Sequence, residues 1–430
     1  MNLTKSLITL FFFSLIVTSC KKDKFIPYPT VTFIKPSQNQ VFDYNDTVQL
    51  SISVTSEDQI EEAKLYLADQ NLQPVGPAAS WFPNAKEATL TCEYPLTDLS
   101  IAGGAYTFLL QITTENNNKN YFRAVDIAPM PRLLLGILAV VKKASTTYEV
   151  QLSQDGISFQ PVFTFSGDYG GSVVNSSANL FLKYGEIISD AVAYSAPGWL
   201  NQWTVQASAS PPFPFYTGIY SNLTDQYLGY FDGTSRGYDK NGTHFFSANC
   251  PTGFYPKLML RNDPWFITVD YAKSGTDRNI SLYNYSTRVL QTSLVISESP
   301  LAMHSRNDDE VFLFSNKNGN AVLKMYHIVT NSISTPYTMP ALPLRDVTQV
   351  DNNNYLLLFD SKIEWYNWSS TSMVPFKTIA GYRLKYEDIS QKVIVASGKS
   401  VHILSFPYGQ TVNSIPLSDT IVGLHLLYNK

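Results

Sequence analysis

Two runs of acidic and amide residues are the first candidates for chemistry in this chain. Asn307-Asp308-Asp309-Glu310 and Asp351-Asn352-Asn353-Asn354 each stand next to an apolar, strand-like stretch. Cleavage of a glycosidic bond needs only two carboxyl groups about 5 to 10 Å apart, and distant parts of a chain can supply them. Asn and Asp side chains also cap turns by bonding to nearby backbone amides. We interpret both runs as solvated turns, with a calcium or sugar site as the alternative.

Local signatures of catalysis are missing elsewhere in the sequence. The five histidines, at positions 244, 304, 327, 402 and 425, show no pair at the spacing of a metal site. The sequence also lacks a Gly-x-Ser-x-Gly elbow, a His-Glu-x-x-His pair and a phosphate-binding glycine loop. We therefore predict no catalytic residue set, no metal and no cofactor. An enzyme whose carboxylates come from separate parts of the chain stays open.

Aromatic residues in an irregular stretch, residues 197–216, are the better candidates for binding. The stretch is too rich in proline for a central strand. Exposed rings on such a loop can stack on a sugar or anchor a protein partner. Packing between strands is the alternative for any of them. The candidate ligand-binding residues are Trp199, Trp203, Phe213, Phe215 and Tyr216.

The N-terminus carries a second kind of chemistry, at a thiol. Lys5 precedes a mostly apolar run from Leu7 to Val17, and Thr18-Ser19-Cys20 follows. The run is too short for a membrane-spanning helix, which needs about 20 apolar residues. This segment resembles the signal peptide of bacterial lipoproteins. The resemblance implies cleavage after residue 19, lipid on Cys20, and anchorage in a bilayer, with residues 20–29 as a proline-stiffened tether.

Composition favours strands and excludes one class of partner. Tyr and Phe number 27 and 25, aromatic residues make up 13% of the chain, and charged residues only 15%. Such a mixture suits half-buried strands better than helices. The net charge of −4 provides no field to hold nucleic acid. Cys92 and Cys250 are expected to be buried free thiols, with a bridge between them as the alternative.

Residues 30–128 show the alternation of a β-sandwich. Val48, Leu50, Ile52 and Val54 alternate with polar residues, and the stretch around Leu65 repeats the pattern. About seven short strands are expected in this range. The opening at 31–36, the step at 45–50 and the turn and strand at 104–108 resemble bacterial immunoglobulin-like and PKD-type domains. That resemblance implies a spacer or adhesive module.

From residue 131 to residue 430 a different repeat appears. Apolar strands recur at spacings of 37 to 47 residues, and each repeat holds about four strands, which is typical of propeller blades. The predicted fold class is thus all-β, an immunoglobulin-like β-sandwich followed by a seven-bladed β-propeller; an array of sandwiches is the alternative. The seven anchor residues are Leu135, Phe181, Leu228, Phe266, Phe312, Leu356 and Val393.

Two local features refine the propeller. One strand, residues 421–428, is left over after seven repeats, and we predict that it completes the first blade near Leu133, because an unclosed ring would expose unpaired sheet edges. The segment Ser153-Gln154-Asp155-Gly156-Ile157-Ser158-Phe159 resembles the Asp-box hairpin of sialidase-type propellers, one residue shorter than usual. The resemblance implies a stabilised hairpin and no sialidase activity.

As a whole the chain resembles the surface lipoproteins of Bacteroidota, many of which serve polysaccharide uptake. The resemblance implies an outer-membrane lipoprotein, with the surface face favoured over the periplasmic face. We expect a non-catalytic binding or scaffolding protein whose partner is a glycan or an envelope protein. A glycan-active enzyme and a purely structural envelope component are the alternatives.

Overall fold

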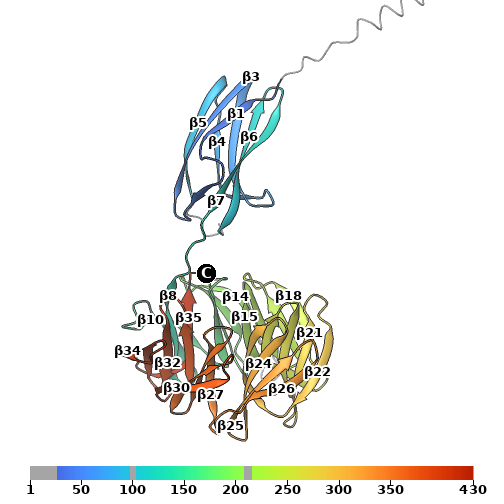
Figure 1. The fold of residues 1–430 in the computed structure, drawn as a ribbon, viewed down its shortest axis with the longest axis vertical. Coiled ribbons are helices and arrows are strands. Elements are labelled where there is room, and N and C mark those ends of the chain that lie inside the picture. The colour runs from blue at the N-terminus through green and yellow to red at the C-terminus, as the bar shows by residue number, and fades with distance from the viewer. Residues whose placement is uncertain (1–26, 97–102, 208–215, 430) are drawn as a thin grey trace, which may run out of the picture. The chain divides into compact units, whose positions relative to one another are not determined.

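Strands are the only long regular elements in the computed structural model, which describes residues 27–96, 103–207 and 216–429 (Figure 1). No helix in these ranges is long and apolar enough to cross a membrane. The signal peptide and Cys20 lie outside them. The chain divides into two units, Met1–Pro131 and Arg132–Lys430. The all-β prediction is confirmed.

The first unit contains seven strands joined by backbone pairing, in the order β1-β3-β6-β7-β2, with β4 and β5 also paired to β3. All pairs are antiparallel except that of β2 with β7. The strands are β1 (Thr30–Lys35), β2 (Gln40–Phe42), β3 (Thr47–Ala68), β4 (Pro74–Trp81), β5 (Ala85–Pro95), β6 (Gly104–Thr114) and β7 (Asn118–Ile127).

Strand β3 organises this unit. Its first part pairs with β5 and β1, and its second part pairs with β6 and β4. The sequence predicted two strands here, around Leu50 and around Leu65, and this was wrong. The chain passes between them through register shifts, of which one lies between Thr55 and Ile60, and no turn separates them.

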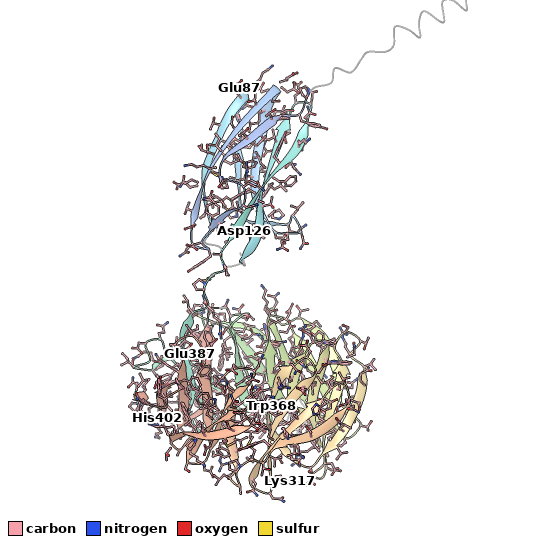
Figure 2. The ribbon with its side chains drawn as sticks, viewed as in Figure 1. Glu87, Asp126, Lys317, Trp368, Glu387 and His402 are labelled. Atoms are coloured by element: carbon pink, nitrogen blue, oxygen red, sulfur yellow. The ribbon has the colours of Figure 1, made fainter. Side chains whose placement is uncertain are left out.

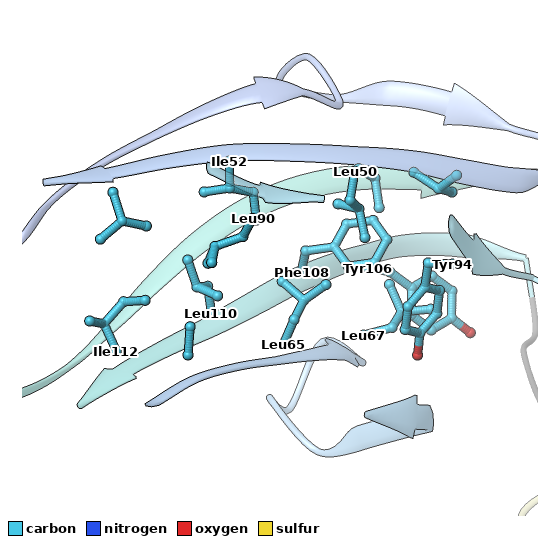
Figure 3. Close-up of a cluster of buried hydrophobic side chains, with 14 of the residues drawn as sticks. Leu50, Ile52, Leu65, Leu67, Leu90, Tyr94, Tyr106, Phe108, Leu110 and Ile112 are labelled. Atoms are coloured by element: carbon cyan, nitrogen blue, oxygen red, sulfur yellow. The ribbon is translucent and has the colours of Figure 1, made fainter. Parts of the chain in front are cut away.

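One apolar cluster fills the interior of the first unit. Leu50 and Ile52 from the first part of β3 meet Leu65 from its second part, together with Phe108 of β6 (Figure 3). Each of these side chains is at most 3% exposed. The alternation that predicted the strands therefore also identifies the side chains that hold both parts of β3 together.

The second unit is a seven-bladed β-propeller of seven four-stranded antiparallel sheets, as predicted (Figure 1). Blade 1 comprises β35 (Thr420–Tyr428), β8 (Leu134–Ala144), β9 (Thr147–Ser153) and β10 (Gln160–Ser166); blade 2 comprises β11 (Gly171–Asn175), β12 (Leu180–Tyr184), β13 (Ala191–Ser195) and β14 (Asn201–Val205). Blade 3 comprises β15 (Tyr216–Asn222), β16 (Asp225–Tyr230), β17 (Thr234–Tyr238) and β18 (His244–Asn249); blade 4 comprises β19 (Phe254–Asn262), β20 (Trp265–Ala272), β21 (Arg278–Asn284) and β22 (Leu290–Ile296).

The remaining blades repeat the same order. Blade 5 comprises β23 (Ser299–Asn307), β24 (Glu310–Lys317), β25 (Asn320–His327) and β26 (Ser332–Tyr337); blade 6 comprises β27 (Leu344–Gln349), β28 (Asn354–Phe359), β29 (Lys362–Asn367) and β30 (Ser372–Thr378); blade 7 comprises β31 (Arg383–Glu387), β32 (Lys392–Ser397), β33 (Ser400–Ser405) and β34 (Thr411–Pro416). The first strand of each blade is its inner strand. Consecutive inner strands contact one another around a closed ring, and we call the line that they surround the propeller axis.

The seven anchor residues of the sequence repeat all fall on the second strand of their blades. This strand is covered on both faces by neighbouring blades, so it reads as a continuous apolar run. In blade 6, for example, all five residues from Tyr355 to Phe359 are fully buried. The burial of this one strand explains why the repeat is detectable without a shared sequence motif.

The C-terminal strand closes the ring. Strand β35 pairs antiparallel with β8, so blade 1 takes its inner strand from the end of the chain and its other three strands from the beginning of the propeller. Ile421, Leu424 and Leu427 are each 1% exposed. The predicted completion of the first blade is thus confirmed, with the added finding that β35 lies next to the propeller axis.

Candidate functional site

The Asp-box-like hairpin joins the outer strands β9 and β10 of blade 1. The Asp155 carboxylate accepts hydrogen bonds from the backbone amides of Ile157 (2.8 Å) and Ser158 (3.0 Å). Ser153 Oγ accepts one from the Gly156 amide at 3.1 Å. Phe159 packs against the apolar cluster between blades 7 and 1. These bonds fix the hairpin in the way that its sequence predicts.

A second turn, between β13 and β14 of blade 2, presents Trp199. Ser195 closes this turn, because its backbone amide donates to Leu200 O at 2.8 Å and its carbonyl accepts from the Trp199 amide at 2.7 Å. Trp199 adopts a left-handed backbone conformation, with φ of 54°. Its indole stacks on Phe163 of β10, with ring centroids 5.8 Å apart and planes inclined by 28°.

The two turns together line a cavity of about 410 Å³. Trp199, Leu152, Pro161 and Val162 form its apolar part. The side chains of Gln154, Gln160 and Ser158 are polar and exposed. Neither glutamine amide takes part in a hydrogen bond within the described ranges, so both are free to bind a ligand. We name this cavity the Trp199 cavity and take it as the candidate functional site.

Asp155 is the one carboxylate in the lining of the Trp199 cavity. Hydrogen bonds from the Ile157 and Ser158 amides hold its pKa below the ordinary value of an aspartate. An aspartate of this kind stays ionised and stabilises the turn. It cannot donate a proton to a leaving group near neutral pH, and no second carboxylate lines the cavity to act with it. The lining of this cavity therefore lacks the pair of carboxyl groups that glycoside cleavage needs.

The other sequence candidates for binding are distributed differently. Trp203 packs parallel to Tyr238, with centroids 5.9 Å apart, and its Nε1 donates to Lys240 O at 3.1 Å. Tyr216 is fully buried in the core between blades 2 and 3, so it cannot reach a ligand from the surface. Phe213 and Phe215 lie outside the described residues. Of the five candidates, the structure therefore brings only Trp199 to a cavity.

Most other large aromatic side chains pack between blades. Packing of this kind was the alternative to ligand binding in the sequence analysis. Trp368, labelled in Figure 2, lies 5.0 Å from Phe312 between ring centroids and belongs to the core of blades 5 and 6. Trp365 packs 5.0 Å from Phe406 in the same manner. Trp199, Trp365 and Trp368 are all half-buried, and what distinguishes Trp199 is its place in the lining of a cavity, which the sequence alone does not reveal.

Both acidic runs form capped turns between the first and second strands of blades 5 and 6. Asn307 Oδ1 accepts from the Asp309 amide at 2.9 Å, and Asp351 Oδ1 accepts from the Asn353 and Asn354 amides at 2.8 and 2.9 Å. The interpretation as solvated turns is confirmed. In the described ranges no group of three or more His, Cys, Asp or Glu side chains is placed to hold a metal.

The two thiols that the structure describes are both free, and they lie in separate units. Cys250 donates to Asp270 Oδ1 at 3.1 Å, and the same buried carboxyl group accepts from Thr268 and Ser281 at 2.6 and 2.5 Å. Burial raises the pKa of the Cys250 thiol, and the Asp270 charge raises it further. Cys250 is therefore a poor nucleophile that stabilises blade 4.

Comparisons with known proteins show no family for this chain. No protein-family model and no curated protein matches the chain. Similar solved structures include the Pan2 WD40 domain of Neurospora crassa (9% identity, TM-score 0.47). The matched region covers 60% of this chain and 82% of the Pan2 chain. For a Quinonprotein alcohol dehydrogenase-like protein of Bacteroides thetaiotaomicron (11% identity, TM-score 0.45), the matched region covers 94% of this chain and 100% of that protein. For Sqt1 of Saccharomyces cerevisiae (11% identity, TM-score 0.47), it covers 67% of this chain and 86% of Sqt1. At these identities the likeness concerns architecture alone.

Proposed function

We propose that this protein is a non-catalytic binding protein of the bacterial cell envelope, and that the Trp199 cavity binds a glycan. In this proposal lipid on Cys20 anchors the chain in the outer membrane, facing the cell surface. Residues 30–128 act as an immunoglobulin-like spacer, which is supported by the seven strands and the single core of the first unit. The propeller carries the binding site.

The composition of the Trp199 cavity is the observation that carries the proposal. Pyranose rings present apolar C–H faces, which stack on aromatic side chains, and hydroxyl groups, which pair with amides and hydroxyls. The cavity offers one indole, two unpaired glutamine amides and the Ser158 hydroxyl. Phe163 already covers one side of the indole and fixes its orientation, so little side-chain entropy is lost on binding.

A glycan-active enzyme is the second candidate, and the described residues favour it less. Asp155 is committed to its turn, and the acidic runs of blades 5 and 6 are committed to theirs. Purified protein incubated with polysaccharides should release no reducing ends. Release of reducing ends above the level of a heat-treated sample would support the enzyme and contradict the proposed function.

Replacement of Trp199 by alanine tests the site directly. On an array of plant, fungal and host glycans we expect the wild-type protein to retain a defined set, and Trp199→Ala to weaken that binding at least tenfold, as truncation of a central aromatic anchor does. Leu200→Ala is the matched control, because Leu200 is the next residue, is 67% exposed and does not line the cavity. Equal loss in both variants, or none in either, would contradict a glycan site at Trp199.

Replacement of Cys20 by alanine tests the anchor. In bacterial cells we expect wild-type protein in the membrane fraction, labelled by a fatty-acid analogue, and Cys20→Ala unlabelled and released from the membrane. Cys92→Ala is the control, because Cys92 belongs to the folded first unit and should leave labelling unchanged. Digestion by protease added to intact cells would support the surface face. An unlabelled wild-type protein would refute lipid anchorage.

A further inference from the structure

A second cavity, of about 490 Å³, lies at the end of blade 1 opposite to the Trp199 cavity. Three inner strands begin there. Arg383 begins β31 and Thr420 begins β35, while Gly170 directly precedes β11. Blades 7, 1 and 2 thus each contribute one wall, and the cavity leads toward the propeller axis. It shares no residue with the Trp199 cavity. We call it the axial cavity.

Two cations at the rim of the axial cavity form no close ion pair in the described residues. Lys142 and Arg383 are exposed, and neither forms an ion pair within residues 27–96, 103–207 and 216–429. Neighbouring cations are paired: Lys143 lies 3.0 Å from Asp419, and Arg345 contacts Asp360. Lys142 and Arg383 thus differ from these two neighbours.

A third cation lies deeper along the same strand. Lys385 follows Arg383 by two residues on β31, so both side chains lie on the same side of the strand. Burial, and after it the Lys385 charge, lowers the pKa of His304 in blade 5 and of His425 in blade 1. All three residues lie on inner strands, β23, β31 and β35, so Lys385 lies near the propeller axis. It too lacks an ion pair in the described part of the chain.

Carboxylates near the axial cavity are already committed to the backbone. Asp346 of β27 accepts from the Leu384 amide at 2.7 Å and from the Val347 amide at 2.9 Å, and burial raises its pKa. Asp168, next to Tyr169, accepts from the Ile187 and Ser189 amides. Against the effect of burial, the charges of Lys385 and Arg383 lower the pKa of Asp346, so this acid interacts with both cations. Lys142, Arg383 and Lys385 still outnumber the two acids, and a net positive field is focused in a narrow space.

Uncharged polar groups continue inward from the cavity. Tyr169 OH lies 2.6 Å from Ser172 Oγ, which in turn lies 2.7 Å from His425 Nε2. In blade 5, His304 Nε2 is buried without a hydrogen bond in the described residues, while the His304 ring interacts with Gln349.

We propose that the axial cavity binds a small organic oxyanion, with the Arg383 guanidinium as the main contact and Lys142 and Lys385 as supporting charges. Arginine presents two parallel N–H donors that match a carboxylate or a phosphate. Tyr148 and Tyr382 wall the cavity with aromatic rings, which suits a ligand that has a body as well as a charge. This site is separate from the proposed glycan site and does not depend on it.

Isothermal titration calorimetry of the full chain at low salt tests the proposal. The probes are galacturonate, citrate and inorganic phosphate, with galactose as the neutral match of galacturonate. We expect at least one anion to bind and galactose not to bind at this cavity. The anion that binds distinguishes a carboxylate from a phosphate ligand. Added salt should weaken the binding, because it depends on charge.

Matched variants locate the binding. Arg383→Gln and Lys385→Gln should each reduce the affinity for the anion at least tenfold. The control is Arg345→Gln, which removes the same charge near the beginning of the adjacent inner strand, β27, and should leave the affinity unchanged. Arg383 is exposed, so its replacement is compatible with folding, which the melting temperature checks. Wild-type protein that binds none of the anions overturns the proposal, and so does galactose binding that Arg383→Gln weakens as much as anion binding. Equal affinity in wild type, Arg383→Gln and Lys385→Gln overturns it as well.

Discussion

Deletion of residues 419–430 should abolish the cooperative unfolding of the propeller. The deletion removes β35, which supplies the inner strand of blade 1, and leaves the β8 edge unpaired. Three fully buried aliphatic side chains, Ile421, Leu424 and Leu427, go with it. At about 1.5 to 3 kcal/mol each, their burial alone contributes about 5 to 9 kcal/mol, which is comparable to the whole stability of a typical domain.

Thermal unfolding followed by circular dichroism and by tryptophan fluorescence measures this effect. We expect one sharp, coincident transition for the full chain and a broad, shifted change for the truncated chain. A point variant provides a milder test: Leu424→Ala should lower the free energy of unfolding by about 2 to 5 kcal/mol. Val412→Ala, on the outermost strand β34 and 57% exposed, should change it by less than about 0.5 kcal/mol.

A truncated protein that melted as sharply as the full chain, near the same temperature, would contradict closure of the ring by β35. Such a result would mean that blade 1 is stable with three strands. The Leu424→Ala variant then becomes decisive, because a small effect there would place Leu424 outside the cooperative core.

The propeller could be predicted from the sequence because its signal is local. The second strand of each blade is buried on both faces, so runs such as Tyr355 to Phe359 recur at nearly constant spacing. The last strand could be placed because a ring must close. Strand β3 was divided wrongly, because the alternation around Leu50 and its repeat around Leu65 were read as two strands, whereas the chain continues between them with a register shift.

The functional sites were far less predictable, because they depend on contacts between blades. Trp199 and Trp203 look alike in the sequence, four residues apart in one irregular stretch, yet one lines a cavity and the other packs on Tyr238. The axial cavity gave no local signal, since its residues come from three blades. His304 and His425 are far apart in the sequence, and the structure places both on inner strands, where the Lys385 charge acts on each of them. The spacing of Arg383 and Lys385 on one strand was the single available hint.

The same two histidines should make the propeller sensitive to acid. Burial, and after it the Lys385 charge, lowers the pKa of His304 to about 4 and that of His425 to about 3. The pKa of an unfolded histidine is about 6.5. Each group therefore binds a proton more readily in the unfolded state. The stability due to the neutral form is present above about pH 6.5 and is lost as the pH falls through the folded-state values.

The size of this loss follows from proton linkage. A shift of one pKa unit corresponds to about 1.4 kcal/mol, so between pH 6.5 and pH 4.5 each histidine should cost up to about 2 kcal/mol of unfolding free energy. Asp346 acts in the opposite direction, because its pKa is raised by burial and its contribution is lost as the pH rises. Comparison of proteins that all retain Asp346 removes this contribution from the difference.

Urea unfolding at a series of pH values measures the loss. We expect the stability of the wild-type protein to fall steeply between pH 6.5 and pH 4.5, and that of the double variant His304→Gln/His425→Gln to fall less, by up to about 4 kcal/mol over this range. His244→Gln is the matched control, because His244 lies exposed on β18 and away from Lys385. Parallel curves for the wild type and the double variant would show that both histidines titrate alike in the folded and unfolded states. In that case the cations around the propeller axis would be well hydrated, and the positive field that we infer for the axial cavity would be correspondingly weak.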